Sequence, residues 1–226
     1  MIEVQTDLRG SFGPARDQGP RPTCLAFAAS DAHAGLRDGW VPLSCEYLFH
    51  QAQRRGGRPP TVGALRPLML EALKEDGQPE ESGWQYLPRT PADPANWKPP
   101  ASVGECFGRN GAISNDDLTA VCELLDNQTP VILHLALSDS FYMPDAQGVV
   151  TPASGERPDF GRRHAVVAVG HGLVNGVQSV LVRNSWGASW GIEGHAWLTE
   201  AFVQPRLLAI TVLSEEVDVS AGSTTA

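Results

Sequence analysis

The sequence predicts an α+β fold with two lobes, because two different residue patterns divide the chain near Pro130. Before Pro130, alanine-rich and amphipathic segments predict helices over 24–37, after Ser44, over 64–76 and over 114–126. After Pro130, segments rich in Val, Leu and Ile predict strands over 131–137, 164–170, 177–184, 195–199 and 207–213. This segregation favours a helical lobe (about 10–126), a β lobe (about 127–214) and a cleft between them. The small, polar tail 215–226 is expected to fray.

Local signals set the expected ends of the helices. Thr23 is the candidate N-cap of the first helix, and Gly39 lies past its end. The helix over 64–76 stops at Gly77, and repeated prolines then predict loops from 78 to 111. Residues 114–117 (Ser-Asn-Asp-Asp) are typical of a capping box that starts the next helix.

A hairpin is expected between the segments 164–170 and 177–184. Asn175-Gly176 is the typical sequence of a two-residue hairpin turn. A hairpin built on this turn brings His164 and Asn184 together at one end and leaves His171 beside the turn.

Composition excludes several classes of function. The 226-residue chain is long enough to bury a full core, and its 26 acidic and 17 basic residues give a net charge of −9. An acidic balance argues against nucleic-acid binding, which needs clustered Lys and Arg. The apolar runs are far shorter than the ~20 residues that span a bilayer, and the first residues do not form a secretory signal. We expect a cytoplasmic protein, a monomer rather than an oligomer, with neither a membrane nor a nucleic-acid partner.

Cys24 differs from the other three cysteines, which are Cys45, Cys106 and Cys122. Without an export signal all four are expected to be free thiols, and none has the C-x2-C spacing of a zinc site. The Gly-Pro-Arg-Pro segment over 19–22 cannot be helical, so Cys24 stands at the corner between a loop and a helix. The positive end of the helix dipole stabilises a thiolate at that corner, which makes Cys24 the candidate nucleophile.

A thiol nucleophile needs a proton shuttle, and His164 is the preferred candidate among six histidines. Asn184, at the same end of the hairpin, would accept a hydrogen bond from one ring nitrogen and leave the other for the thiol. Trp186 would cover that bond and exclude water. Four other histidines are interpreted as packing or surface residues, or lack an evident partner: His33, His50, His171 and His195.

Three blocks of the sequence resemble the papain family (C1-type) of cysteine peptidases. They are residues 14–27 (Pro-Ala-Arg-Asp-Gln-Gly…Cys-Leu-Ala-Phe), 163–170 (Arg-His-Ala-Val-Val-Ala-Val-Gly) and 183–191 (Arg-Asn-Ser-Trp-Gly-Ala-Ser-Trp-Gly). Cys24 and His164 are 140 positions apart (164 − 24), and the family's window is about 130–150 residues. The resemblance implies a papain-like two-lobe fold, one catalytic domain over 1–226, and hydrolysis of peptide bonds through a thioester acyl-enzyme.

The resemblance also implies the roles of four residues. Cys24 would be the nucleophile, His164 the general base and acid, and Asn184 the residue that orients the imidazole. Gln18 would donate its side-chain amide to the oxyanion, beside the backbone N–H of Cys24.

The substrate contacts are likewise implied by the resemblance. Gly63 would offer backbone hydrogen bonds to an extended peptide, and Trp186 would shield the His–Asn pair. His134 and Ala165 would approach the pocket for the residue two before the cleaved bond. A histidine there predicts a weaker preference for large aliphatic side chains; the alternative is a His134 buried and bonded within the sheet. The expected partner is a peptide or protein substrate, and neither a cofactor nor a metal is implied.

Some positions depart from the family pattern. Arg21 stands where the family has a half-cystine, and Leu25 replaces an aromatic residue. Arg163 places a cation next to the imidazole, which would weaken a thiolate–imidazolium pair unless the side chain points to solvent. Met1 stands near the start of the family's mature domain, so we expect either a chain trimmed there or latency without an N-terminal propeptide.

Two alternative functions are compatible with the same four catalytic residues. A transamidase or maturation enzyme would pass the acyl group to an amine instead of water. A catalytically inactive papain-fold binding module is weakened by the presence of all four catalytic residues.

Overall fold

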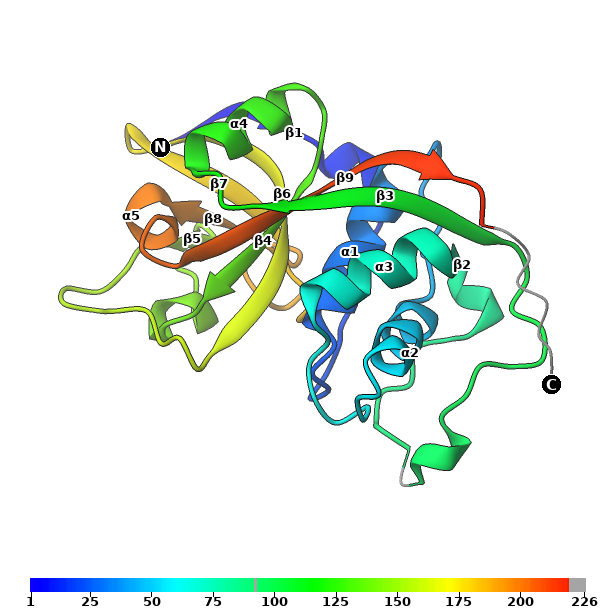
Figure 1. The fold of residues 1–226 in the computed structure, drawn as a ribbon. Helices are drawn as coiled ribbons and strands as arrows, with labels where there is room; N and C mark the ends of the chain where they lie inside the picture. The colour runs from blue at the N-terminus through cyan, green and yellow to red at the C-terminus, as the bar shows by residue number, and fades with distance from the viewer. Residues whose placement is uncertain (92, 220–226) are drawn as a thin grey trace.

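The computed structural model describes residues 1–91 and 93–219 (Figure 1). Its α-helices are α1 (Cys24–Gly35), α2 (Cys45–Arg55), α3 (Arg66–Glu75), α4 (Leu118–Asp126) and α5 (Glu200–Val203). Short 3₁₀ helices lie at Arg9–Ser11, Glu81–Gly83, Pro94–Asn96 and Asp139–Tyr142. Within the described ranges, no helix is long and apolar enough to cross a bilayer.

The strands are β1 (Ile2–Asp7), β2 (Gln78–Pro79), β3 (Cys106–Ser114), β4 (Val131–Ala136), β5 (Val149–Val150), β6 (Arg163–Val174), β7 (Val177–Arg183), β8 (His195–Thr199) and β9 (Leu207–Val217). In the described part of the chain they form one nine-stranded sheet of order β2-β3-β9-β4-β6-β7-β8-β5, with β1 also paired to β6. All pairs are antiparallel except β5 with β8. The α+β class and the mainly antiparallel β lobe agree with the sequence-based expectation.

Helices α1, α2 and α3 cluster on one side, whereas α4 and α5 lie with the strands of the β lobe on the other (Figure 1). Strands β3 and β9 run side by side from one lobe to the other. Helix α1 packs against α2 and α3 and also against β4 and β6, so it lies between the lobes. Its residues 25–34 are all buried, and five of them are alanines, whose small side chains allow close packing on both sides. Cys24 therefore begins a helix held by both lobes.

Several local signals act as expected. Ser44 caps α2 by accepting the Tyr47 N–H at 3.1 Å. Asn175 and Gly176, at φ of 50° and 77°, form the turn between β6 and β7 with Val174 opposite Val177. Thr23 precedes α1, but its side chain does not cap the helix; its hydroxyl lies 2.8 Å from the Tyr86 hydroxyl instead.

Strand β3 occupies the end of the region expected to be loops. Its glycines lower its intrinsic preference for a strand, and pairing with β9 stabilises it. A Cβ on Gly108 would lie 2.8 Å from the Val217 carbonyl oxygen, so glycine permits the close approach. Because β3 continues to Ser114, the predicted capping box does not form, and Asp117 caps α4 by accepting the Thr119 and Ala120 N–H groups at 2.9 and 3.1 Å.

The expected lobe boundaries also change. Strand β1, which was not predicted, pairs with β6, and α4 packs on β4 and β6 rather than on the other helices, so both belong to the β lobe. Residues 215–217 continue β9 because they pair with β3, so the predicted frayed tail does not begin at 215. Residues 220–226 lie outside the described part.

Candidate active site

Cys24 is the first residue of α1 and is half-buried. Gly19, at a φ of 57°, and the prolines around Arg21 keep the preceding segment out of a helical conformation. Backbone groups of Ala165, Leu25 and Cys24 itself act on the sulfur and lower the pKa of the thiol, against burial, which raises it. Since Ala165 follows His164, the sulfur lies against the part of β6 that carries the predicted base.

His164 and Asn184 form the predicted pair. His164 Nε2 lies 2.7 Å from Asn184 Oδ1, and both residues are buried. Asn184 Oδ1 also accepts the backbone N–H of Ser185 at 2.8 Å, so this amide atom is the oxygen. An oxygen can only accept, so Nε2 carries the hydrogen and Nδ1 is the ring nitrogen left for the thiol.

Aromatic rings cover the histidine as predicted for Trp186. The ring centroids of His164 and Trp186 are 4.8 Å apart, and the edge of Phe141 approaches the histidine with centroids 5.7 Å apart. Tyr142 stacks on Trp186 with centroids 5.3 Å apart and an interplanar angle of 17°. These rings exclude water from the His164–Asn184 bond, which strengthens it.

Gln18 is buried and its amide is held at both ends. Its Oε1 accepts the Ser185 hydroxyl at 2.7 Å, and its Nε2 donates to the Arg21 carbonyl at 2.7 Å. An amide nitrogen has two hydrogens, so one remains for a substrate oxygen. The Gln18 N–H donates to the Ser185 carbonyl at 2.9 Å, so the loop before Cys24 is joined directly to the segment that follows Asn184.

An ion-pair cluster that the sequence analysis did not identify aligns these segments. Asp31 of α1 accepts from Arg16 Nε at 2.9 Å and from Arg183 Nε at 2.6 Å. Arg16 precedes Gln18 by two residues and Arg183 directly precedes Asn184, so Asp31 ties both to the helix of Cys24. Charged residues inside alanine-rich and valine-rich segments were the available signal.

Burial is the main influence on the pKa values of Cys24 and His164. Burial raises the pKa of the Cys24 thiol and outweighs the backbone groups, which lower that pKa. It lowers the pKa of His164 to about 4, against the Asn184 hydrogen bond. Each charge alone is therefore disfavoured. Proton transfer from thiol to imidazole creates both charges together, and each then stabilises the other. Arg163 does not oppose this, because it is exposed and its Nε donates to the Phe160 carbonyl at 3.2 Å.

The residues expected to contact substrate lie around the same centre. Gly63 is exposed, and a Cβ built on it would lie 3.8 Å from the Pro22 carbonyl, near the nucleophile loop. His134 is opposite Ala165 across β4 and β6, so both face the same side of the sheet. His134 is buried, and its Nε2 lies 2.8 Å from the Thr211 hydroxyl, as in the alternative of a histidine bonded within the sheet.

The remaining histidines and cysteines lie elsewhere. His171 pairs with Asp126 at 2.7 Å beside α4, and His195 Nδ1 lies 2.9 Å from the Glu193 carbonyl. All four cysteines are free. Burial raises the pKa of Cys45 to about 12 and also raises those of Cys106 and Cys122.

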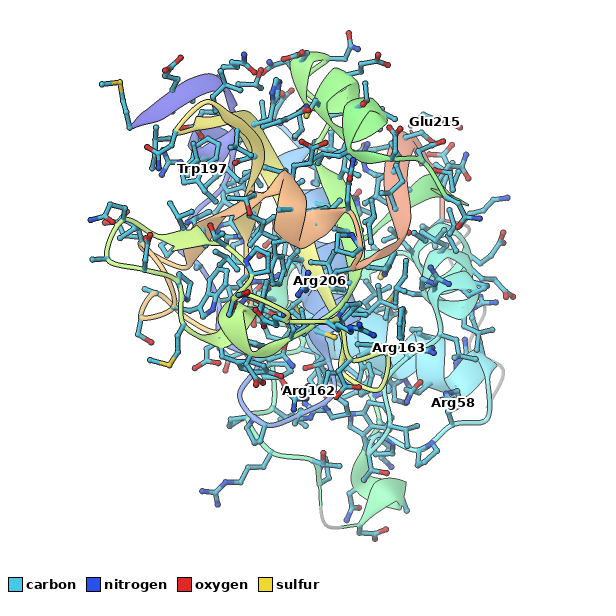
Figure 2. The ribbon with its side chains drawn as sticks, turned by 90° about the vertical axis from the view of Figure 1, so that its left-hand side faces the viewer. Arg58, Arg162, Arg163, Trp197, Arg206 and Glu215 are labelled. Carbon is cyan, nitrogen blue, oxygen red and sulfur yellow. The ribbon has the colours of Figure 1, made fainter. Side chains whose placement is uncertain are left out.

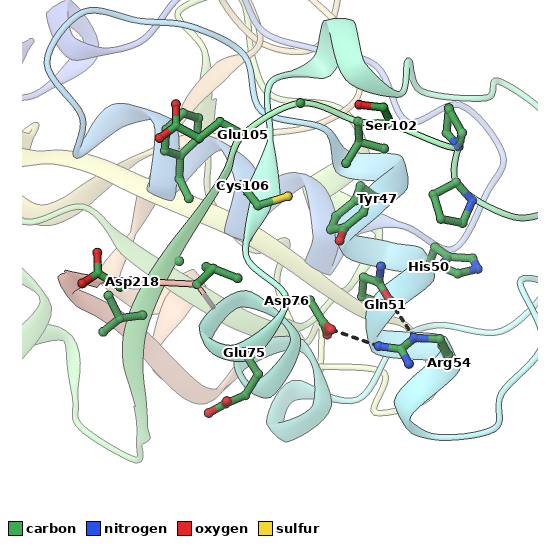
Figure 3. A pocket seen from close by; sticks show the side chains of 18 of the residues that line it. Tyr47, His50, Gln51, Arg54, Glu75, Asp76, Ser102, Glu105, Cys106 and Asp218 are labelled. Carbon is green, nitrogen blue, oxygen red and sulfur yellow. Dashed lines mark hydrogen bonds and ion pairs between the residues drawn. The ribbon is translucent and has the colours of Figure 1, made fainter. Parts of the chain in front are cut away.

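A hollow of about 1300 Å³ lies away from Cys24, on the helical lobe (Figure 3). Tyr47, His50 and Arg54 of α2 line one side, and Cys106 approaches from the start of β3 (Figure 3). None of Gln18, Cys24, His164 or Asn184 borders it. The hollow is lined by both acidic and basic side chains, and Arg54 is paired to Asp76 at 2.9 Å. This lining therefore does not favour one class of ligand.

Comparison with known proteins agrees with this geometry. The family model described as papain family cysteine protease matches residues 69–205, which contain His164 and Asn184. Peptidase 1 of Dermatophagoides farinae is 26% identical over 205 residues, covering 87% of this chain and 60% of the mite protein. Mouse pro-cathepsin H is 25% identical over 193 residues, covering 80% of this chain and 55% of its own length. The chain thus spans at most about 60% of the length of these relatives.

Solved structures show the same fold. Xylellain, a cysteine protease from Xylella fastidiosa, superposes with a TM-score of 0.73 at 20% identity, covering 95% of this chain and 87% of its own. Procathepsin B S9 from Trypanosoma congolense gives a TM-score of 0.75 at 13% identity, covering 96% and 79%. These likenesses establish the papain-like fold. The family model covers more than half of the chain, and the protein therefore belongs to the papain family of cysteine proteases.

Proposed function

We propose that this protein is a cysteine peptidase that hydrolyses peptide bonds through a thioester acyl-enzyme. The observation that carries the proposal is the His164 Nε2–Asn184 Oδ1 hydrogen bond of 2.7 Å, with the Cys24 sulfur against the backbone of Ala165. A nucleophile, a base and a residue that orients the base are the three parts that nucleophilic catalysis requires. Membership of the papain family supports the same reaction.

In the acylation step, His164 Nδ1 takes the proton of the Cys24 thiol as the sulfur attacks the substrate carbonyl carbon. The oxyanion that develops is met by the backbone N–H of Cys24 and by the second hydrogen of Gln18 Nε2, both preorganised. His164 then gives its proton to the leaving amine, and the C–N bond breaks to leave a thioester. Water, deprotonated by the same imidazole, hydrolyses the thioester and releases the acid.

The substrate is proposed to be an extended peptide or protein segment. The exposed Gly63 would bond the backbone of this segment through its N–H, since Arg58 Nη2 occupies the Gly63 carbonyl at 3.0 Å. Ala165 would border the pocket for the side chain two before the cleaved bond. His134, opposite it on β4, would approach that pocket only with the part of its ring that the bond to Thr211 leaves free. Figure 2 shows Arg58 on the helical lobe and Arg163 at the start of β6, so each lobe contributes an arginine side chain.

The test compares wild type with Cys24→Ala on a peptide pool derived from a proteome, with products read by mass spectrometry. We expect new termini with wild type and none with Cys24→Ala, and equal profiles would refute the proposal. An added amine distinguishes the transamidase, because its products carry the mass of that amine whereas a hydrolase gives free acids. The comparisons favour neither the transamidase nor the inactive binding module.

A further inference from the structure

Arg21 is buried three residues before the nucleophile and pairs with Glu46 of α2. Its Nη2 donates to Glu46 Oε1 at 2.9 Å and its Nη1 to Glu46 Oε2 at 2.5 Å. The guanidinium also lies over the rings of Tyr86 and Phe49, 5.0 and 5.7 Å from their centroids. A bidentate pair enclosed in this way fixes both the position and the plane of the arginine side chain.

Glu46 is fully buried and joins three segments of the chain. Besides Arg21, its Oε1 accepts Trp97 Nε1–H at 2.6 Å, and its Oε2 accepts the Leu87 N–H at 3.0 Å. Four donors on two oxygens satisfy the carboxylate, so α2, Leu87, Trp97 and the nucleophile loop are held together at one point.

The backbone of Arg21 reaches the catalytic residues. Its carbonyl oxygen accepts the Gln18 Nε2–H at 2.7 Å and the Thr23 N–H at 2.9 Å. The oxygen that aims the Gln18 amide therefore belongs to the residue whose side chain Glu46 holds. Displacing the Arg21 side chain would shift this carbonyl and release the Gln18 amide from one of the two hydrogen bonds that hold it, the other being to the Ser185 hydroxyl.

We propose that the Arg21–Glu46 ion pair positions the Gln18 amide for the oxyanion. Both are positioning residues, because they act through the Arg21 carbonyl and do not reach the reacting atoms. The pair joins the nucleophile loop to the helical lobe at the position where the resemblance places a half-cystine. An ion pair, unlike a disulfide, is not broken by a reductant. This inference rests on the proposed peptidase function.

The test is a double-mutant cycle of Glu46→Gln with Gln18→Ala, read as kcat and KM. Glu46→Gln turns one acceptor into a donor facing Arg21, which breaks the bidentate pair at nearly constant volume. In the wild-type background we expect kcat to fall at least tenfold (on the order expected for an Å-scale misplacement) with KM within about twofold. In the Gln18→Ala background, Glu46→Gln should lower kcat less than about twofold further, because its target is already gone.

An equal fall of kcat in both backgrounds would overturn the inference while leaving the peptidase function intact. A wild type without peptidase activity would overturn both. The rate of Cys24 alkylation by iodoacetamide should stay unchanged in Glu46→Gln, because forming the thiolate does not use the Gln18 amide. Arg54→Gln, which breaks an exposed ion pair on the same helix, is the matched control and should retain wild-type kcat.

If Glu46→Gln does not fold, the double variant Arg21→Met with Glu46→Gln removes the pair without leaving a buried unpaired charge, and the glutamine oxygen still accepts a hydrogen bond from Trp97 or Leu87. We expect this variant to fold and to show the same fall in kcat at an unchanged KM, and again no further fall in the Gln18→Ala background. A folded double variant with wild-type kcat would overturn the inference.

Discussion

Asn184 holds His164 in one tautomer: its Oδ1 accepts from His164 Nε2 at 2.7 Å and, in addition, from the Ser185 N–H at 2.8 Å. The second bond fixes the amide, the amide fixes the ring, and Nδ1 is left for the thiol of Cys24. The rings of Trp186 and Phe141 keep water away from the first bond. The orientation of the base therefore depends on a single side-chain oxygen.

Removing that oxygen is expected to reduce catalysis without unfolding the protein. In Asn184→Ala the imidazole loses its orientation and can adopt the other tautomer, so we expect kcat/KM to fall about 10–100-fold, a fraction of what general acid–base catalysis contributes. Steady-state kinetics on a peptide substrate measures this. Asn110→Ala, which removes a half-buried asparagine bonded to Glu215 at 2.6 Å, is the control and should keep wild-type kinetics. Equal kinetics in both variants would remove Asn184 from the mechanism.

Asp31 is expected to matter mainly for stability. Asp31→Asn leaves Arg16 and Arg183 without their shared carboxylate, and losing one partner of a buried ion pair costs about 3–5 kcal/mol. Urea unfolding at pH 7 measures the loss. Asp139→Asn, at an exposed pair with Arg162, should cost no more than ~1 kcal/mol. A loss of similar size in both variants would contradict the role given to Asp31.

Acid sensitivity should follow the buried neutral histidines. Burial lowers the pKa of His134 to about 3 and that of His33 to about 3. Between the unfolded pKa of about 6.5 and those folded values the unfolded chain binds more protons, so stability falls as pH falls, by about 1.4 kcal/mol per pH unit for each histidine. Urea unfolding from pH 8 to pH 4 should show this slope. His134→Gln, which keeps a hydrogen bond for Thr211, should make it shallower; an unchanged slope would contradict the assignment.

Substrate selection should reflect the charge near His134. Burial is the main cause of the lowered pKa of His134, and the positive charge of Arg66, at the start of α3, lowers it further. We expect the pocket to accept polar or acidic side chains two residues before the cleaved bond and to select large aliphatic ones weakly. A peptide library measures the preference, with Arg66→Gln as the variant that should reduce the acidic component. Strong selection of Leu or Phe at that position by wild type would show the prediction to be wrong.

The predicted elements that the structure confirms are those with local signals. The helix at Cys24 and the hairpin at Asn175-Gly176 follow from alanine content and from a two-residue turn, and the hairpin was enough to pair His164 with Asn184. Strand β1 carried a local signal, Ile2, Val4 and Thr6 alternating with polar residues, which the sequence interpretation overlooked. Strand β3 was missed because its glycines favour a strand only weakly and its partner β9 is distant in sequence. The same limit explains why Asp31, which joins positions far apart in the chain, was not foreseen.

The roles of Arg21 and Gln18 show the same division. The sequence shows that an arginine stands where a half-cystine is usual. It does not show that Arg21 forms an ion pair with Glu46, 25 residues away. The amide of Gln18 could be proposed for the oxyanion from its position before Cys24. Of its two anchors, the Arg21 carbonyl lies three residues away in the same loop, whereas the Ser185 hydroxyl is 167 residues away and is brought to Gln18 only by the fold.

Selective alkylation of Cys24 tests the central claim most directly. With iodoacetamide at pH 5.5, we expect Cys24 to react at least tenfold faster than the other three cysteines, whose raised pKa values keep them as thiols. His164→Ala should abolish that advantage, because without the imidazole burial alone sets the raised pKa of the Cys24 thiol. Equal labelling of all four cysteines in wild type, or an advantage that survives His164→Ala, would contradict a thiol activated by His164.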